Sequence, residues 1–464
     1  MDKEEEEFWD DGNKETPQPA RETQPSAKGE GAPVGKKHWV RNVCMIVLAL
    51  VIAGVGAVAG WLGAYYSVDP RMRELQWLLD ALETQHYKEV DLDEVYDALY
   101  DAVMPDIFSA YYTEEEYALI VEESQGTNRG IGISVVQQTD APALVYTVVE
   151  NSPAQRAGLK KGMYLFGCSA VGEAMREGGA DEIMAFIDAQ EGDFCLWAGY
   201  EKDAAQASPY TMRREVYNAG YCVYRDSEVS YARRDGAADG ALLAETGDPL
   251  AGLDEDTAYI RLDGFDGQCA DEFAACMDVF KARGKTDLIL DLRDNGGGYL
   301  NDLQHIASFF TKDTGEAEPV VAYAEYRSGT RFYYTAAGNW YDDYFTESSE
   351  ITVLADDGSA SASECLIGAM IDYGAIGYED IYLRKDEGAT DCSTYGKGVM
   401  QAMLPSPQGG VFQLTVARIF WPVSGKCIHE RGVRESDGAN GVVAPYLPGE
   451  TDIMLGSVVA AVCP

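Results

Sequence analysis

The pattern of apolar and polar residues divides the chain into segments of different character. Residues 1–38 are rich in Glu, Pro and Gln and contain few apolar residues, a composition that predicts a disordered acidic tail. Residues 43–64 follow, and none of them carries a charge. Between residues 70 and 123, apolar residues recur at intervals of three and four, which predicts helices over 67–125.

The uncharged segment has the length and the flanks of a membrane-spanning helix. Its residues would extend about 33 Å as a helix, enough to cross the hydrocarbon core of a bilayer. Lys36, Lys37 and Arg41 precede it, and the positive-inside rule then places the N-terminus in the cytoplasm. We therefore expect a single transmembrane helix at 39–66, a cytoplasmic tail at 1–38 and an extracytoplasmic remainder in the cell membrane.

Beyond residue 125 short strands and helices mix. The stretch 126–215 reads as a small module of strands with two helices, and from 216 to 464 strands alternate with helices. Such alternation predicts a mixed α/β fold with a largely parallel, buried sheet. Two glycine- or serine-rich turns, DNGGG at 294–298 and DDGSAS at 356–361, each follow a predicted strand. We expect both turns at the carboxyl edge of that sheet, where functional loops gather.

Charge and cysteine content exclude several classes of protein. The formal net charge of -42 argues against a nucleic-acid partner, because binding to phosphates needs a basic surface. The spacings of the ten cysteines match no zinc pattern, so we favour buried free thiols over disulfides. The DNGGG turn lacks the Gly-Lys-Ser/Thr of a phosphate-binding loop. The chain therefore gives no reason to expect a metal or a nucleotide cofactor.

The serine-rich turn has two interpretations. Ser361 and Glu364 have the spacing of a helix capping box, and this structural role would be sufficient for an isolated motif. The functional interpretation uses the same geometry. A serine on a turn between a strand and a helix exposes its hydroxyl, and the helix N-terminus offers N–H groups to a developing oxyanion.

A nucleophilic serine needs a base, and the four histidines of the chain lie in poorly suited segments. Lys397 is flanked by glycines and precedes a strand-like run. In an extended strand Lys397 and Gln401 would share a face, so that the amide could orient the amine. To act as a base the lysine must be neutral, which burial favours. The alternative is an ordinary solvated lysine at a strand end.

Three segments in the same order resemble the C-terminal processing peptidases, the tail-specific serine proteases. They are DLRDNGGGYL at 291–300, GSASASE at 358–364 and GKGVMQ at 396–401. RGIGISV together with SPAQRAGLKKG resembles the PDZ domain of that family. The resemblance implies a mixed α/β fold with a PDZ-like peptide-binding module at 126–215 and a catalytic domain at 216–464.

The resemblance also implies roles for individual residues. Ser361 corresponds to the nucleophile, Lys397 to the general base and Gln401 to the residue that orients the lysine. The N–H of Ala362 and one N–H of the pair Gly297 and Gly298 would form the oxyanion hole. In the PDZ-like module, the loop of Gly130, Ile131, Gly132 and Ile133 would hold the C-terminal carboxylate of a substrate.

The chain departs from the family pattern in two places near these motifs. Gly296 stands where the family usually has proline, and residues 382–394 look like an insertion ahead of the lysine. Such an insertion could shape the cleft, carry regulation or misplace Lys397. Asp372 matches an acidic position of some members, and packing at a helix end explains it as well.

The sequence thus predicts a membrane-anchored serine endopeptidase that acts on proteins or peptides with accessible C-termini. The leading alternative is a catalytically inactive PDZ-type scaffold on the same fold. A receptor ectodomain would need a cytoplasmic effector domain, for which residues 1–38 are too short. Gly56 and Gly60 form a GxxxG pair, which is compatible with a homodimer.

Overall fold

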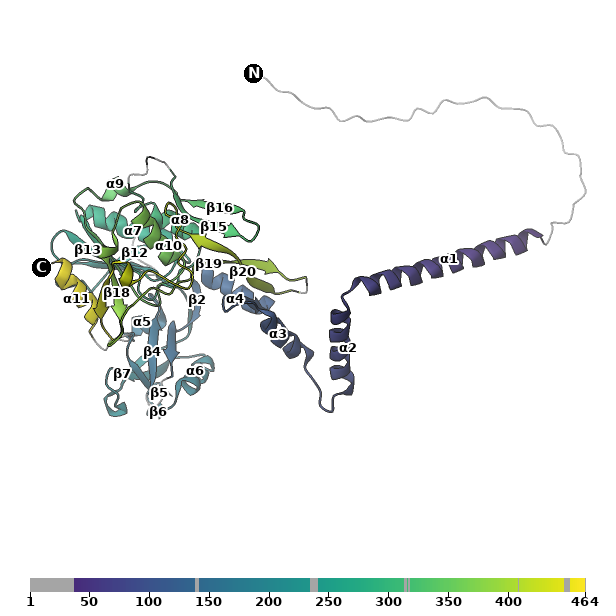
Figure 1. Ribbon diagram of the computed structural model, residues 1–464. Helices are drawn as coiled ribbons and strands as arrows, with labels where there is room; N and C mark the ends of the chain where they lie inside the picture. Colours follow the sequence, from purple (N-terminus) through teal and green to yellow (C-terminus); the bar gives the residue numbers. More distant parts are fainter. Residues whose placement is uncertain are drawn as a thin grey trace, which may run out of the picture. The chain divides into compact units, whose positions relative to one another are not determined.

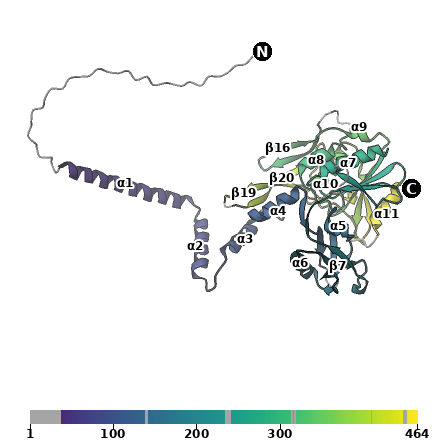
Figure 2. The ribbon, with the colours of Figure 1, turned by 180° about the vertical axis from the view of Figure 1, so that it is seen from behind.

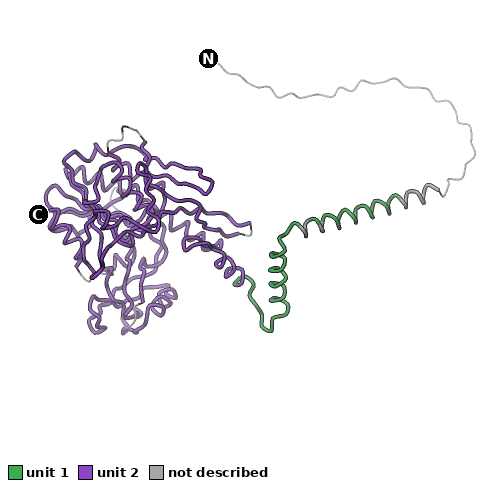
Figure 3. The backbone as a smooth tube through the Cα atoms, viewed as in Figure 1, with its two compact units in different colours: residues 1–94 green, residues 95–464 purple. Residues whose placement is uncertain are grey.

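The structure is a computed structural model that describes residues 37–137, 142–233, 241–312, 315, 318–407, 409–445 and 451–463. The predicted disordered tail lies outside these residues except for its last two positions. The side chains of 37–44, 61, 62 and 64–66 are likewise outside the description. The chain forms two units, residues 1–94 and 95–464 (Figure 3).

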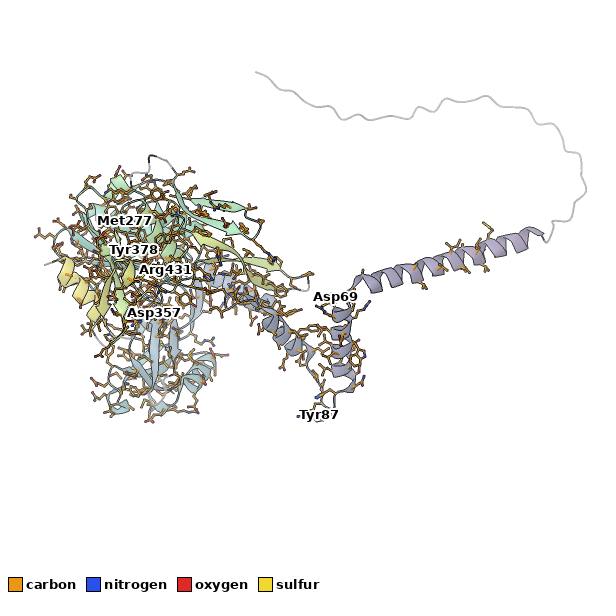
Figure 4. All side chains as sticks on the ribbon, viewed as in Figure 1. Asp69, Tyr87, Met277, Asp357, Tyr378 and Arg431 are labelled. Atoms are coloured by element: carbon orange, nitrogen blue, oxygen red, sulfur yellow. The ribbon has the colours of Figure 1, made fainter. Side chains whose placement is uncertain are left out.

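The first unit is helical. It contains α1 (Lys37–Ser67), α2 (Pro70–Gln85) and the start of α3 (Leu92–Val103). Asp69, labelled in Figure 4, caps the N-terminus of α2. Its side chain accepts a hydrogen bond from the N–H of Arg71. The predicted transmembrane segment 39–66 falls within α1. Across the described part of the chain, no helix combines the length and the apolar content that crossing a membrane requires.

The second unit contains the PDZ-like module, whose strands and helices gather together in Figures 1 and 2. Its antiparallel sheet has the order β3-β4-β5-β7-β8, with β6 added to β5. The bounds are β3 (Ile133–Val136), β4 (Ala143–Val148), β5 (Tyr164–Ala170), β6 (Arg176–Glu177), β7 (Phe194–Gly199) and β8 (Ser208–Met212). The two predicted helices are α5 (Pro153–Ala157) and α6 (Ala180–Asp188), and β2 (Thr127–Gly130) pairs separately with β9 (Glu215–Asn218).

Helix α5 shows why this sequence folds as it does. Ser152 caps its N-terminus by accepting the N–H of Gln155, and Pro153 occupies the first turn, where no N–H is needed. Gly158 ends the helix with φ 92°, a left-handed conformation that favours glycine. The following residue, Leu159, then enters the core of the module beside Leu165.

The rest of the second unit, where the sequence predicts a catalytic domain, is built on an eight-stranded sheet of order β12-β11-β10-β13-β14-β17-β18-β21. The bounds are β10 (Cys222–Arg225), β11 (Ser230–Arg233), β12 (Leu243–Thr246), β13 (Thr257–Leu262), β14 (Asp287–Asp291), β17 (Ile351–Ala355), β18 (Ile381–Lys385) and β21 (Asn440–Val443). The pairs from β13 to β21 are parallel, and those from β12 to β13 are antiparallel. The prediction of a largely parallel sheet is therefore correct only for its second half.

Among the described residues, four helices line the main core: α7 (Cys269–Ala282), α8 (Leu300–Ala307), α9 (Tyr341–Tyr344) and α10 (Ala362–Asp372). Helix α11 (Ile453–Val462) packs in a separate, smaller cluster, and α4 (Glu114–Ser124) contacts β1 and β2. Met277 of α7, labelled in Figure 4, is fully buried in the core together with Leu366 of α10. The nine cysteines from Cys168 onwards are all free, and six of them are buried. These six agree with the expectation of buried free thiols, whereas Cys392, Cys427 and Cys463 are only half-buried.

A second, antiparallel sheet was not predicted. It consists of β1 (Ala110–Tyr112), β15 (Val320–Tyr326), β16 (Arg331–Thr335), β19 (Val399–Pro405) and β20 (Val411–Phe420). Strands β15 and β16 form one hairpin and β19 and β20 another. Strand β1 joins them from the N-terminal side, with Ala110 opposite Gln413. The expected strand that follows Lys397 is thus part of this sheet, outside the parallel one.

Candidate active site

The two predicted turns meet at the carboxyl edge of the parallel strands. Strands β14 and β17 are neighbours, so the turns that follow them lie side by side. The N–H of Asp294 donates to the side chain of Asp356 at 2.9 Å. The N–H of Ala360 and the hydroxyl of Ser363 both donate to the carbonyl of Asn295, each at 2.9 Å. These bonds hold the serine-rich turn against the glycine-rich turn.

Ser361 immediately precedes α10, at its N-cap, in an unusual backbone conformation. Its φ is 56° and its ψ is -110°, a combination that non-glycine residues rarely adopt and that is found mostly at functional sites. Its side chain makes no capping hydrogen bond to the helix. Instead, its N–H donates to the carboxylate of Glu364 at 3.0 Å. The capping-box interpretation is therefore correct for Glu364 but does not account for the Ser361 hydroxyl.

The backbone of Gly297 packs directly against Ser361, with no side chain between them. Its φ is 94°, and a Cβ at this position would lie 2.8 Å from the N atom of Ala362 and 2.8 Å from Cβ of Ser361. Its N–H already donates to the side chain of Asn295 at 2.9 Å. Around Gly298, the N–H of Phe265 donates to the carbonyl of Gly297, and the N–H of Tyr299 donates to the carbonyl of Phe265. Neither of those two bonds uses the N–H of Gly298.

Glu364 joins the serine turn to the lysine segment. One carboxylate oxygen, Oε2, accepts the N–H of Ser361 at 3.0 Å and the N–H of Lys397 at 2.9 Å. The other, Oε1, accepts the hydroxyl of Thr394 at 2.5 Å and the N–H of Gly396 at 2.8 Å. The N atoms of Ser361 and Lys397 therefore lie within about 6 Å of each other. Burial raises the pKa of Glu364, while these four bonds act in the opposite direction.

Lys397 is half-buried, and its ammonium nitrogen lies 5.1 Å from the centre of the Phe108 ring. Burial lowers the pKa of the amine, because removal of water disfavours the charged form. This partial burial disfavours the alternative of a fully solvated lysine at a strand end.

Gln401 lies on β19, and its amide nitrogen donates to the hydroxyl of Thr415 on β20 at 3.1 Å. The simple alternation from Lys397 to Gln401 does not hold, for two reasons. Lys397 precedes β19, which begins at Val399, and a bulge interrupts the register between Met400 and Gln401. The two residues are thus placed by the bulge and by β20 rather than by a regular strand.

The apparent insertion 382–394 is part of the fold. It begins within β18, which lies between β17 and β21 in the parallel sheet. It ends at Thr394, whose hydroxyl binds Glu364. The segment therefore leads the chain back to Glu364 and to the backbone of Lys397.

Asp372 serves a structural role at the end of α10. Its carboxylate accepts the N–H groups of Val423 and Ser424, each at 2.9 Å, and the Ser424 hydroxyl at 3.1 Å. These bonds hold the turn after β20. At Gly296, a Cβ would meet no atom within 4 Å, so the loop does not depend on glycine there.

The predicted carboxylate-binding loop of the PDZ-like module precedes an edge strand. Gly130 and Gly132 have φ values of 118° and 75°. The carbonyl of Ile131 accepts the N–H of Ala154 at 3.0 Å, which ties the loop to α5. Ile133 begins β3, the outermost strand of its sheet. An extended peptide could add to the free edge of this strand.

Three residues at the site were missed by the sequence analysis, namely Asp106, Phe108 and Thr415, whereas His429 was considered there and set aside as a base. The side chain of Asp106 accepts the hydroxyl of Thr415 at 3.1 Å. The ring of Phe108 lies 6.4 Å from the ring of His429. These residues come from segments without a recognisable motif, and only the fold brings them to Lys397 and Gln401.

Comparison with known proteins relates the chain to a family of peptidases. The model of peptidase family S41 matches residues 256–378. The carboxy-terminal processing protease CtpA of Bacillus subtilis is 22% identical over 401 residues, which cover 85% of this chain and 74% of CtpA. CtpB of the same organism is 21% identical over 369 residues, covering 79% of this chain and 67% of CtpB.

A solved structure shows the same fold. The putative S41 protease from Bacteroides fragilis superimposes with a TM-score of 0.50 at 15% identity, over 83% of this chain and 96% of that protein. A probable CtpA-like serine protease of Staphylococcus haemolyticus is 21% identical over 86% of this chain and 72% of its own length. The chain thus contains a peptidase family S41 domain and is similar over most of its length to C-terminal processing proteases, which supports a serine-type endopeptidase.

Proposed function

We propose that the protein cleaves peptide bonds with Ser361 as nucleophile and Lys397 as general base. The observation that carries the proposal is the shared carboxylate oxygen of Glu364, which brings the backbones of Ser361 and Lys397 together. Two further observations support it. The backbone of Ser361 has the strained conformation of a functional residue, and burial lowers the pKa of Lys397.

In the proposed reaction, the hydroxyl oxygen of Ser361 attacks the substrate carbonyl while the neutral amine of Lys397 takes the hydroxyl proton. The N–H groups of Ala362 and Gly298 stabilise the negative oxygen of the tetrahedral intermediate. We assign Gly298 rather than Gly297 because the N–H of Gly297 already has a partner. Lys397 then gives its proton to the leaving amine, and water releases the acyl group from Ser361.

We propose that the PDZ-like module selects substrates by their C-termini. The edge position of β3 supports addition of a peptide strand, and Gly130, Ile131, Gly132 and Ile133 would supply N–H groups for the terminal carboxylate. Binding of a peptide labelled at its N-terminus, compared with the same peptide amidated at its C-terminus, tests this. Equal affinities would exclude recognition of a free carboxylate.

We also propose that the catalytic part lies outside the cytoplasm, held by a helix at the cell membrane. The proposal rests on the uncharged sequence 43–64 and on Lys36, Lys37 and Arg41 before it. Side chains such as Met45 and Ile52 of α1 are more than half exposed. Extraction of membranes with alkaline carbonate tests the anchor, and release of the full chain into the supernatant would contradict it.

The decisive experiment uses the full chain and a fluorophosphonate probe, which reacts with activated serines. We expect labelling at Ser361, found by peptide mapping, together with cleavage of unfolded proteins that have apolar C-termini. Ser361→Ala should abolish both, whereas Ser328→Ala, at an exposed turn, should abolish neither. Peptide binding without labelling or cleavage would favour the inactive scaffold instead.

A further inference from the structure

The segment 104–109, between α3 and β1, reaches both proposed partners of the catalytic serine. Phe108 lies against Lys397, and Asp106 is linked to Gln401 through Thr415. We propose that Phe108 and Asp106 are positioning residues of the active site, the first by covering the lysine amine and the second by fixing the orientation of the Gln401 amide. The inference rests on the proposed roles of Lys397 and Gln401.

Phe108 is held in place from both sides. Its carbonyl accepts the side-chain amide of Gln413 on β20 at 2.8 Å, and its N–H donates to Asp106 at 2.9 Å. Its ring lies 6.4 Å from the rings of Tyr395 and His429. These two hydrogen bonds fix the backbone of Phe108, so that its ring stays over the amine of Lys397. Together with Tyr395 and His429, the ring forms an aromatic surface beside the amine.

The ring acts on Lys397 in two opposite ways. It excludes water, which disfavours the charged ammonium, and its face attracts a cation, which favours the charged form. The ring centre lies 5.1 Å from the amine nitrogen, and burial lowers the pKa of Lys397, so we expect the exclusion of water to be the larger effect. The proposed role of Phe108 is thus to exclude water from the Lys397 amine. Another bulky apolar side chain can fill this role.

Asp106 acts through a directed chain of hydrogen bonds. A carboxylate can only accept, so Thr415 must give its single hydroxyl hydrogen to Asp106, at 3.1 Å. The Thr415 oxygen must then accept its other bond, from the amide nitrogen of Gln401 at 3.1 Å. This leaves the side-chain carbonyl of Gln401 as the end that can receive a hydrogen from Lys397. The charge of Asp106 therefore decides which end of the amide faces the lysine.

The anchoring of Asp106 supports this directed role. The same oxygen of Asp106 also accepts the N–H of Phe108 and the hydroxyl of Ser109, at 2.9 and 3.1 Å. Ser109 is buried and its hydroxyl oxygen accepts the N–H of Thr415 at 3.2 Å. Segment 104–109 and strand β20 are thus joined through both the backbone N–H and the side-chain hydroxyl of Thr415.

Other titratable groups near Lys397 come from each neighbouring element. Glu364 of α10 binds the Lys397 backbone N–H, and Asp106 belongs to the segment itself. His429, followed by Glu430, lies in the loop after β20, with the His429 ring near Phe108. Tyr395 precedes the lysine in sequence. None of these groups changes in the variants of Phe108 that test its role.

The test measures the pKa of Lys397 directly, by competitive acetylation of the full chain across pH followed by mass spectrometry. Phe108→Ala should raise the midpoint by about one pH unit, a tenfold loss of neutral amine at a given pH. Phe108→Leu should leave the midpoint close to that of the parent. Ile107→Ala, at a neighbouring residue that is 83% exposed, is the control and should change nothing. An unchanged midpoint in Phe108→Ala overturns the role of Phe108.

The orientation of Gln401 needs a second variant. Thr415→Val keeps the shape of the side chain but removes the hydroxyl. We expect a loss of about tenfold in kcat for peptide cleavage, with no upward shift of the Lys397 midpoint. A variant with unchanged kcat would overturn the role of the Asp106 chain. Because the acetylation readout needs no peptidase activity, an inactive parent would refute the proposed function while leaving the Phe108 result interpretable.

Discussion

The backbone N–H groups of Ser361 and Lys397 donate to the same oxygen of Glu364, at 3.0 and 2.9 Å. The serine starts a helix above the parallel sheet, and the lysine leads into the antiparallel sheet. One buried carboxylate therefore limits the distance between the backbones of the two residues that we propose exchange a proton.

Glu364→Gln should disable the enzyme without removing either catalytic group. The amide of glutamine has one oxygen, so its NH₂ group must face two of the four donors, and two hydrogen bonds are lost. We expect a drop in kcat/KM of about a hundredfold or more and a lower free energy of unfolding in urea. Glu387→Gln, at an exposed position, is the matched control. Parent-like kcat/KM in Glu364→Gln would contradict the role of the carboxylate.

Gly297→Ala and Gly296→Ala should differ sharply although the positions are adjacent. At Gly297 the new Cβ would lie 2.8 Å from the Ala362 nitrogen, at a φ of 94° that alanine disfavours. At Gly296 the Cβ meets nothing within 4 Å. We therefore expect Gly297→Ala to lose labelling by fluorophosphonate and Gly296→Ala to retain it. Equal labelling of both variants would show that the close approach of Gly297 is unimportant.

Lys397→Arg should abolish peptide cleavage, because a guanidinium stays protonated at any pH the protein tolerates. Loss of a general base lowers the rate by about a hundredfold to ten-thousandfold. Cleavage of an unfolded protein, followed by mass spectrometry of the fragments, measures this. Lys160→Arg, at an exposed residue of the PDZ-like module, controls for the exchange itself. A fully active Lys397→Arg variant would exclude lysine as the base.

The activity should rise with pH. Burial lowers the pKa of Lys397, and the amine accepts a proton only in its neutral form, which dominates above that pKa. A plot of kcat/KM against pH should therefore climb and then level off, with its midpoint below about 10.4, the value for a free lysine. A flat profile would show that the titration of an amine does not limit the rate.

Arg293→Met should destabilise the fold more than loss of an ordinary ion pair. Burial opposes the charge of Asp291, but attraction and hydrogen bonds from Arg293 hold the pKa of Asp291 well below its usual range. Removal of the guanidinium leaves a buried charge poorly paired, which costs about 3 to 5 kcal/mol at neutral pH.

The pH dependence of that loss gives a further check. The stabilisation from a carboxyl with a lowered pKa is fully present above its unfolded value, about 3.9, and fades as the pH falls below it. The difference between parent and Arg293→Met in urea unfolding should therefore shrink in acid. Arg213→Met, which removes an exposed pair with Asp193, should have a much smaller effect. A loss that is independent of pH would contradict this account of Asp291.

Local patterns predicted the parts of the site that lie next to each other in sequence. The turns with Gly297 and Ser361 follow buried strands, and parallel pairing of those strands brings them together. The spacing from Ser361 to Glu364 predicted the bond between them. The sequence could not show that Glu364 also binds Lys397, because that contact depends on the path of the chain through β18.

The rest of the site depends on contacts that leave no periodic signal. The bulge beside Gln401 breaks the alternation on which the strand argument relied. Phe108 and Asp106 belong to a short segment between a helix and a strand, and their partners lie about 300 residues later in the chain. A single side chain in a loop carries no pattern, so only the folded chain reveals what it covers.

The bond between Asp106 and Thr415 spans 309 positions of sequence. During synthesis the N-terminal end of this bond leaves the ribosome long before its partner exists. Contacts between such distant residues form late in folding, because a long loop must close first. A growing chain would therefore carry Ser361, the proposed nucleophile, in an incompletely assembled site. Chains stalled on the ribosome before Thr415 should react with fluorophosphonate far more slowly than released chains.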